Sequence, residues 1–435
     1  MKKLFTFILG LCVALNALAL DREHTLKVYN WADYIDEDLI GEFEAWYKEQ
    51  TGEEVKIIYQ LFDINEVMLS KIEMGKEDFD VVCPSDYIIE RMLRLDLLLP
   101  IDRDFGSTPD YTVNVSPFMV KMLGNTDSNG VNVSDYAVPY MWGTCGLLYN
   151  TKYVDAEKVK SWEVLKDPAY KGKIFIKNAF RDVYTSLLVG LKKDEIAAGK
   201  VTVEDVCRDA SPESIALVEA WLNEVKDGVQ GWEEDFGKEM MTKEKGWINL
   251  SWSGDAQWAI EEAEAVGVDL DYVIPEEGST VWYDAWVIPK YAKNVKAARY
   301  FIDFMCMPEN ALRNMDAIGY VSSIGGPEVL AAKIDSTAFE PIDASYFFGP
   351  EATSVCVNPV QYPDAAIVSK LGNLHDNPDH TEDLLDMWTR VKGDNASATT
   401  YVIIAIAVLA LIAGYLLSKK KNKSHKKSHH APKRK

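Results

Sequence analysis

Two short patterns in the chain each place a tryptophan within three residues of an aspartate. They are Trp252-Ser-Gly-Asp255 and Trp282-Tyr-Asp284. An indole ring attracts an organic cation through its quadrupole, and an ionised carboxylate attracts the same cation through its charge. For one such pair, the alternative is a core tryptophan beside an aspartate that caps a turn. A second pair of the same kind favours a binding site for an organic ammonium group.

Both patterns fall where β-strands are expected to end. Residues 249–252 and 285–289 are short apolar runs of strand type, and glycine or proline bounds each run. The polar residues beside these runs would therefore lie at the edges of a sheet. Because α/β proteins bind their ligands at such edges, both patterns are expected to lie at a binding site.

The first part of the chain alternates strand patterns with helix patterns. Residues 25–30 alternate as a strand does, and residues 37–50 carry their apolar side chains on one helical face. Further strands are predicted at 55–59 and 79–85, and further helices at 65–74 and 87–95. This alternation is typical of an open α/β sheet. It places four candidate residues at the carboxyl ends of strands: Trp31, Tyr34, Ser85 and Tyr87.

A change of composition at residues 136–149 indicates a second lobe. The run is apolar and rich in strand-forming residues, and we interpret it as a crossing out of the first lobe. A chain of 435 residues also exceeds the size at which a single core stops growing. The chain is expected to cross back at 282–289. The expected lobes are residues 24–139 with 282–325, and residues 140–281 with 326–392.

The two ends of the sequence carry membrane-targeting patterns. Residues 1–19 combine a basic start, an apolar run and a small-residue cleavage pattern, which predicts a signal peptide. Residues 398–417 are uncharged and long enough for one transmembrane helix. The basic residues of 418–435 predict a cytoplasmic tail by the positive-inside rule. The expected location is therefore the periplasmic or extracytoplasmic face, with the C-terminal helix anchored in the cytoplasmic membrane.

The charge between the two ends narrows the class of ligand. Residues 20–400 contain all 68 acidic residues but only 35 of the 46 Lys and Arg residues, which gives a formal charge of −33. Such a field attracts cations and repels nucleic acid, so no nucleic-acid partner is expected. A solvated, soluble surface has the same composition, and charge alone does not separate the two interpretations.

The sequence offers little for other kinds of site. A hydrolase needs a nucleophile beside a base, and residues 20–397 contain three histidines, none in a recognisable motif. His375 and His380 would bind zinc only with a third ligand that the sequence does not place. Ferric ion would require tyrosine and histidine together, and an anion would require arginine or a bare helix N-terminus. We therefore expect no enzyme, no metal and no cofactor.

Eight motifs, in order over roughly residues 24–392, resemble those of the bacterial periplasmic spermidine/putrescine-binding proteins of polyamine ABC transporters. The motifs are Tyr29-Asn-Trp-Ala-Asp-Tyr34, Val82-Cys-Pro-Ser-Asp-Tyr87, Val138-Pro-Tyr-Met-Trp-Gly143, Ser161-Trp-Glu-Val-Leu165, Arg181-Asp-Val183, Trp252-Ser-Gly-Asp255, Trp282-Tyr-Asp284 and Ile318-Gly-Tyr320.

The resemblance implies a fold, a function and partners. The fold is the bilobed α/β fold of type II periplasmic binding proteins, with two open sheets flanked by helices, an interlobe cleft and here a C-terminal transmembrane helix. The function is the membrane-tethered substrate-binding component of a polyamine ABC importer, which captures putrescine or spermidine and delivers it to the permease subunits. The alternatives are a binding protein for another cationic or small solute, or an exported enzyme.

The resemblance also implies ligand-binding residues, when the family's positions are carried over one by one. They are an aromatic wall, a set of acids and a polar turn, with one late amide: Trp31, Asp33, Tyr34, Ser85, Tyr87, Asp182, Trp252, Asp255, Trp282, Asp284, Tyr320 and Gln361. Ala32 and Ala179 depart from the family's pattern. These departures leave the choice among putrescine, spermidine and related amines open.

Overall fold

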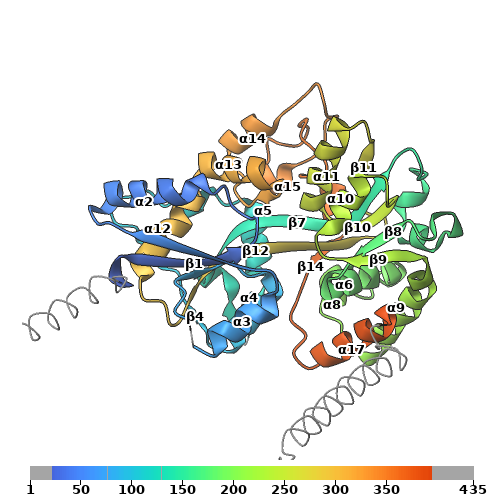
Figure 1. The fold of residues 1–435 in the computed structure, drawn as a ribbon, viewed down its shortest axis with the longest axis horizontal. Coiled ribbons are helices and arrows are strands. Elements are labelled where there is room, and N and C mark those ends of the chain that lie inside the picture. Colours follow the sequence, from blue (N-terminus) through green and yellow to red (C-terminus); the bar gives the residue numbers. More distant parts are fainter. Residues whose placement is uncertain (1–21, 76, 129, 394–435) are drawn as a thin grey trace, which may run out of the picture.

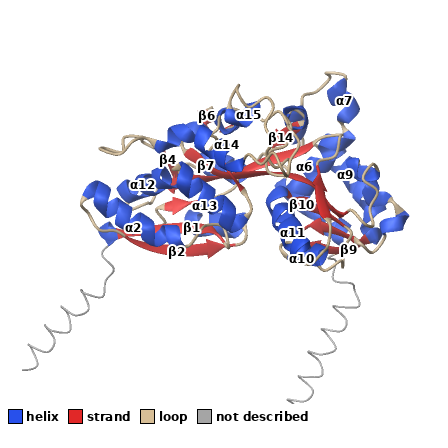
Figure 2. Ribbon diagram, turned by 90° about the horizontal axis from the view of Figure 1, so that it is seen from above, coloured by secondary structure: helices blue, strands red, loops and turns tan. Residues whose placement is uncertain are grey.

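The computed structural model describes residues 22–75, 77–128 and 130–393. They form two lobes that lie side by side and are joined by two long strands (Figure 1). Figure 2 shows the same two lobes from above. The strand order β2-β1-β3-β12-β7-β10-β8-β9 runs through both lobes. We expected two open sheets; the strands instead form one hydrogen-bonded sheet, because β12 and β7 pair where the lobes meet.

The first-lobe strands are parallel next to one another and antiparallel to β12. β1 pairs in parallel with β2 on one side and with β3 on the other. This arrangement brings the carboxyl ends of β1 and β3 to the same edge of the sheet. The strands are β1 (Thr25–Trp31), β2 (Lys56–Phe62), β3 (Val81–Val82), β4 (Leu98–Leu99) and, in a separate hairpin, β5 (Asp127–Ser128) and β6 (Val131–Asn132).

The second-lobe strands β10, β8 and β9 are parallel to one another, and β10 is antiparallel to β7. Their carboxyl ends also meet at one edge. The strands are β8 (Ile174–Lys177), β9 (Val229–Glu233), β10 (Ile248–Trp252) and β11 (Leu270–Val273). Two short strands, β13 (Val321–Ser322) and β14 (Leu371–Asn373), pair with β7 and β12.

The two runs that we interpreted as crossings form β7 (Ala137–Asn150) and β12 (Ser279–Pro289), and every residue of both strands is buried. A strand buried on both faces has an almost continuous apolar sequence, as these two do. Their antiparallel register shifts once: Ala285 pairs with Pro139, and Asp284 pairs with Met141. Tyr140 is therefore an extra residue on β7, which makes a β-bulge opposite Asp284.

Helices cover both faces of the sheet in each lobe. α2 illustrates the local cause: Leu39, Phe43 and Tyr47 recur every four residues and are buried, and the helix ends where Gly52 adopts φ 74°. The first-lobe helices are α2 (Asp38–Thr51), α3 (Asn65–Glu73), α4 (Asp86–Arg94), α5 (Pro117–Gly124), α12 (Val295–Met305), α13 (Pro308–Ile318), α14 (Pro327–Lys333) and α15 (Ser345–Phe348).

The second-lobe helices fall into two layers. α10 (Phe236–Thr242) and α11 (Ser253–Ala265) lie on one side of its strands, and the others lie on the opposite side (Figure 1). Those others are α6 (Phe180–Leu191), α8 (Val203–Cys207), α9 (Pro212–Val225) and α17 (Thr381–Lys392). Two further short helices are α7 (Lys193–Ala197) and α16 (Ala365–Val368).

Each lobe has its own apolar core. Residues of α2 and α12 fill one side of the first lobe, and residues of α3, α4 and α5 fill the other. Phe347 and Tyr362 belong to this first-lobe core, whereas Leu384 and Met387 belong to the second-lobe core. The stretch 326–392, which we assigned to the second lobe, therefore contributes to both cores. The lobe limits stay a prediction.

His375 links helices of the two lobes. It follows β14, and its ring nitrogens hydrogen-bond with Glu90 of α4 and Glu204 of α8. Burial lowers the pKa of the imidazole, but the two carboxylates outweigh burial and raise this pKa above its ordinary value. The two carboxylates therefore favour the charged form of this histidine.

One part of the expected fold class, the C-terminal transmembrane helix, is not supported by the described residues. No helix of the described ranges is both long and apolar enough to cross a membrane. The predicted transmembrane helix at 398–417 lies outside the described residues, as do the signal peptide at 1–19 and the basic tail at 418–435. For the described residues, the fold class is therefore corrected to the bilobed α/β fold, and the membrane helix is not part of what the structure supports.

Candidate functional site

The candidate site is built from strand ends of both lobes. Tyr34 and Ser85 follow β1 and β3, and Trp252 is the last residue of β10. Asp182 lies in the first turn of α6, shortly after β8. Trp282 and Asp284 lie on β12, where the lobes meet. Because carboxyl ends of neighbouring parallel strands share one edge, these residues converge although they are far apart in the sequence.

Asp284 lies at the centre of the site. Its carboxylate accepts hydrogen bonds from the Tyr34 hydroxyl at 2.8 Å and from the Ser85 hydroxyl at 2.7 Å. The side chain is buried, and burial raises the pKa of Asp284 from 3.8 to about 6, against the lowering effect of these hydrogen bonds. None of the ion pairs within the described ranges involves Asp284. A buried carboxylate without a cation is a favourable position for a ligand's ammonium group.

Asp182 is the second acid of this site that forms no ion pair among the described residues. It accepts a hydrogen bond from Trp252 Nε1 at 2.9 Å, and the Cys145 thiol lies 3.8 Å away. Burial raises the pKa of Asp182, although the Trp252 hydrogen bond opposes the rise. The negative charge of Asp182 also contributes to the raised pKa of Asp284. Both carboxyls would ionise more readily beside a bound cation.

Aromatic rings connect the two acids. The ring centroids of Trp252 and Trp282 are 6.5 Å apart, those of Trp282 and Tyr320 are 5.7 Å apart, and those of Tyr320 and Tyr34 are 5.4 Å apart. Glycine allows this packing: a Cβ on Gly254 would lie 2.3 Å from the Tyr320 ring. The rings form the apolar wall that methylene groups between two ammonium groups would require.

Asp255 differs from the other two acids because cations of the protein already hold it. It pairs with Lys177 Nζ at 2.5 Å and with Lys238 Nζ at 3.5 Å, and it accepts a hydrogen bond from the Tyr320 hydroxyl at 2.9 Å. Burial would raise the pKa of Asp255, but the two lysines lower it below its ordinary value. This carboxylate is therefore neutralised inside the protein.

The four remaining predicted residues do not hydrogen-bond to Asp284: Tyr87 is linked to it through other side chains, and Trp31, Asp33 and Gln361 have other surroundings. Tyr87 joins through Asn65, whose amide donates to the Tyr87 hydroxyl at 3.1 Å and to the Ser85 hydroxyl at 3.0 Å. Trp31 packs on Phe62, with ring centroids 4.5 Å apart. Asp33 is exposed and has a positive φ of 50°. Gln361 is half-buried and lies in a turn, where its backbone N–H donates to the carbonyl oxygen of Asn358.

Three residues that the structure adds to the site did not stand out in the sequence. They are Asn65, Lys177 and Lys238. Asn65 starts α3 directly after the end of β2, and its position at a strand end was a usable signal. The two lysines gave none, because a lysine at the end of a strand, as Lys177 is, or in a short helix, as Lys238 is, is ordinarily a solvated surface residue.

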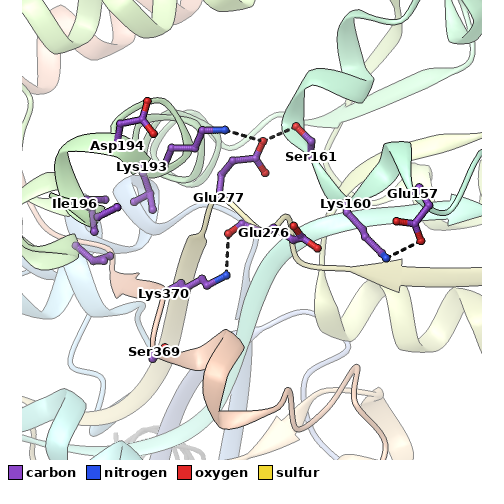
Figure 3. Close-up of a pocket in the computed structure, with 13 residues that line it drawn as sticks. Glu157, Lys160, Ser161, Lys193, Asp194, Ile196, Glu276, Glu277, Ser369 and Lys370 are labelled. Atoms are coloured by element: carbon purple, nitrogen blue, oxygen red, sulfur yellow. Dashed lines mark hydrogen bonds and ion pairs between the residues drawn. The ribbon is translucent and has the colours of Figure 1, made fainter.

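A cavity of about 700 Å³ lies elsewhere, beside α6 and α7 (Figure 3). Two of its lysines already have partners: Lys193 Nζ lies 3.8 Å from the Glu277 carboxylate, and Lys370 Nζ donates to the backbone carbonyl of Glu276 at 3.0 Å. None of the predicted binding residues lines it. Among the described residues, no group of three or more His, Cys, Asp or Glu side chains is placed to hold a metal ion.

The bilobed α/β fold, with acidic and aromatic side chains at strand ends of both lobes, defines a type II periplasmic solute-binding protein. A family model described as bacterial extracellular solute-binding protein matches residues 42–334, and the chain belongs to that family. The members of this family bind solutes and are not enzymes, which confirms our prediction on that point.

Relatives and solved structures agree with this class. The putrescine-binding periplasmic protein of Escherichia coli is 27% identical over 88% of this chain and 95% of its own length. The spermidine/putrescine-binding periplasmic protein of the same organism is 28% identical over 75% of this chain and 84% of its own length. The structure of a spermidine/putrescine ABC transporter substrate-binding protein from Streptococcus pneumoniae has a TM-score of 0.63 and 28% identity, and covers 85% of this chain and 98% of its own.

Proposed function

We propose that the chain is the substrate-binding component of a polyamine ABC importer. It captures putrescine or spermidine outside the cytoplasm and delivers the amine to permease subunits. The names of the relatives support this ligand class, because several of them bind putrescine or spermidine. The family to which the chain belongs supports the extracellular location.

The observation that carries the proposal is Asp284. It is a buried carboxylate that has two hydroxyl donors and no ion-pair partner among the described residues, and it follows a buried tryptophan on the same strand. A primary ammonium has three donors and is strongly hydrated, so a closed site must replace its water with acceptors and an aromatic surface. Asp284 supplies the acceptors, and Trp282 with Tyr320 supplies the surface.

The proposed ligand-binding residues divide into three groups. Direct contacts come from the residues that surround Asp284 and Asp182: Tyr34, Ser85, Trp252, Trp282 and Tyr320. Tyr87 supports Ser85 through Asn65. Trp31, Asp33 and Gln361 are retained from the family resemblance as contacts that a bound ligand would complete.

Isothermal titration calorimetry of the purified protein with putrescine, spermidine, an amino acid and a divalent metal tests the proposal. We expect saturable binding of at least one polyamine, weaker at high salt because the contacts are ionic. Asp284→Asn should abolish or strongly weaken this heat, whereas Asp386→Asn, which removes an exposed carboxylate of α17, should leave it unchanged. Binding of the amino acid or the metal, with no binding of either polyamine, would refute the proposal.

A further inference from the structure

We propose that Lys177 is a built-in ammonium group that occupies the amine position formed by Trp252 and Asp255, and so restricts the ligand to a diamine. This inference deepens the proposed function and rests on it. It concerns the choice between putrescine, with two ammonium groups, and spermidine, with three.

The surroundings of Lys177 are those of a bound ammonium ligand. Its Nζ lies 2.5 Å from Asp255, 3.2 Å from Glu233 and 2.6 Å from the Glu234 carbonyl oxygen. The same nitrogen lies 4.4 Å from the ring centroid of Trp252. Three acceptors match the three donors of an ammonium group, and the indole face covers it. The Lys177 side chain is only 1% exposed, so its position is closed to solvent.

This position is continuous with the rest of the site. Trp252, which covers Lys177, also donates its Nε1 hydrogen to Asp182. Asp255, which pairs with Lys177, also accepts from Tyr320, whose ring lies against Trp282. The tryptophan and aspartate pattern at 252–255 therefore does hold an organic ammonium, but that ammonium belongs to the protein.

The balance of charge follows from these contacts. Asp255 and Glu233 are both paired with Lys177, and Asp255 is also paired with Lys238. Asp182 and Asp284 form no ion pair among the described residues, and two ammonium groups would neutralise them. A third ammonium placed towards Asp255 would meet the like charge of Lys177, and like charges a few ångströms apart disfavour each other.

Truncating Lys177 would open the ammonium position between Asp255 and Trp252. Lys177→Ala removes a propylammonium group and leaves Asp255, Glu233 and the Trp252 face without it. Calorimetry should show that the parent binds putrescine at least about tenfold more tightly than spermidine. The variant should shift this ratio by about tenfold or more towards spermidine, the size of effect that a desolvated charge contact carries. Lys192→Ala, which removes a partly buried ion pair with Asp209 in the same lobe, is the matched control and should leave the ratio unchanged.

Chemical rescue provides a readout that a merely structural lysine would not give. n-Propylamine should raise the melting temperature of Lys177→Ala, because it refills the vacated position, and should not raise that of the parent or of Lys192→Ala. If Lys177→Ala does not fold, Lys177→Gln serves instead, because it removes the positive charge and keeps a hydrogen-bond donor towards Glu233. That variant should also shift the affinity ratio towards spermidine, by at least about threefold, because the like charge that repels a third ammonium is gone.

The outcomes separate this inference from the proposed function. If the parent binds neither polyamine, the proposed function fails. If the parent binds putrescine and spermidine equally, or if the folded Lys177→Ala variant keeps the parent's ratio and ignores n-propylamine, the inference on Lys177 is wrong while the proposed function stands. A folded Lys177→Gln variant that keeps the parent's ratio would also overturn it.

Discussion

Replacing Asp284 with asparagine should stabilise the ligand-free protein and weaken polyamine binding at the same time. The carboxylate is buried and its pKa is raised to about 6 from 3.8. An unfolded chain ionises this group at its ordinary value, so above about pH 6 folding must bury a charge that the unfolded state leaves in water. Asparagine fills the same space without that charge: its amide oxygen accepts a hydrogen bond from one of the two hydroxyls, and its NH2 group donates to the oxygen of the other.

The magnitude follows from the raised pKa. The pKa of Asp284 rises from 3.8 to about 6, and each pKa unit corresponds to about 1.4 kcal/mol. The buried charge therefore destabilises the folded parent by about 3 kcal/mol above pH 6. The effect should be absent below about pH 3.8, about half as large at pH 5 and complete above pH 6. For a protein of this size, about 3 kcal/mol corresponds to a melting temperature about 3–4 °C higher in the variant.

Binding should change in the opposite direction. A ligand ammonium buried beside asparagine lacks the charge of its partner, which costs about 2–5 kcal/mol, or about thirtyfold to several-thousandfold in affinity. Putrescine at about 100 times its Kd should stabilise the parent by about 2.7 kcal/mol, and the same concentration should stabilise the variant by less than about 1 kcal/mol.

Differential scanning calorimetry at pH 5 and pH 8, with and without putrescine, measures both effects. Asp386→Asn is the control, since it removes an exposed carboxylate from α17. The reasoning would be refuted if Asp284→Asn melted below the parent at pH 8 without ligand, or if both proteins gained equally from putrescine. Either result would make Asp284 a structural hydrogen-bond acceptor.

Three further predictions concern the site and its surroundings. Trp282→Leu removes stacking and cation–π contacts of about 1–2 kcal/mol, so calorimetry should show a smaller loss of putrescine affinity than for Asp284→Asn; an equal or larger loss contradicts this ranking. Putrescine affinity should fall about tenfold per pH unit below about pH 6, where Asp284 becomes protonated, and Ser85→Ala should move this fall to higher pH because one hydrogen bond to the carboxylate is lost. His375→Gln should lower the free energy of unfolding most at low pH, because the parent has the stabilisation from the charged histidine in full below about pH 6.5 and loses it as the pH rises through the raised pKa. Chemical denaturation at pH 6 and pH 9 should therefore show a larger loss of stability at pH 6, and equal losses would exclude a charged histidine.

The sequence predicted the elements of the first lobe well because their signals are local. The spacing of Leu39, Phe43 and Tyr47 indicated a helix at 37–50, and the structure has α2 at Asp38–Thr51. The strand expected at 25–30 is β1 at Thr25–Trp31. Their alternation also predicted correctly that Tyr34 and Ser85 follow strand ends, where the structure brings them to Asp284.

The partners of each acid could not be predicted, because they depend on contacts between distant parts of the chain. Asp255 and Lys177 are 78 residues apart in sequence, and only the parallel pairing of β8 with β10 brings them together. The sequence therefore presented Asp182, Asp255 and Asp284 as equivalent acids, although one of the three is already neutralised. Asp33 shows the same limit: it neighbours Trp31 and Tyr34 in sequence, yet its left-handed backbone leaves it exposed.

The extra residue Tyr140 on β7 has a consequence for how the length of this chain can vary. Side chains of a strand alternate between two faces, but the bulge absorbs one extra residue, so the neighbours Tyr140 and Met141 both face the core beneath α2 and α12. Before the bulge, Val138 and Tyr140 face the core beneath α2 and α12; after it, Trp142 faces the opposite core with Phe347. Deleting Tyr140 alone would remove the bulge and let β7 pair with β12 in one continuous register, so Met141 and Trp142 would keep their faces. A single deletion elsewhere in β7 would instead turn the residues between it and the bulge to the opposite face. The bulge is therefore the position at which β7 can lose one residue without exchanging the faces of its side chains.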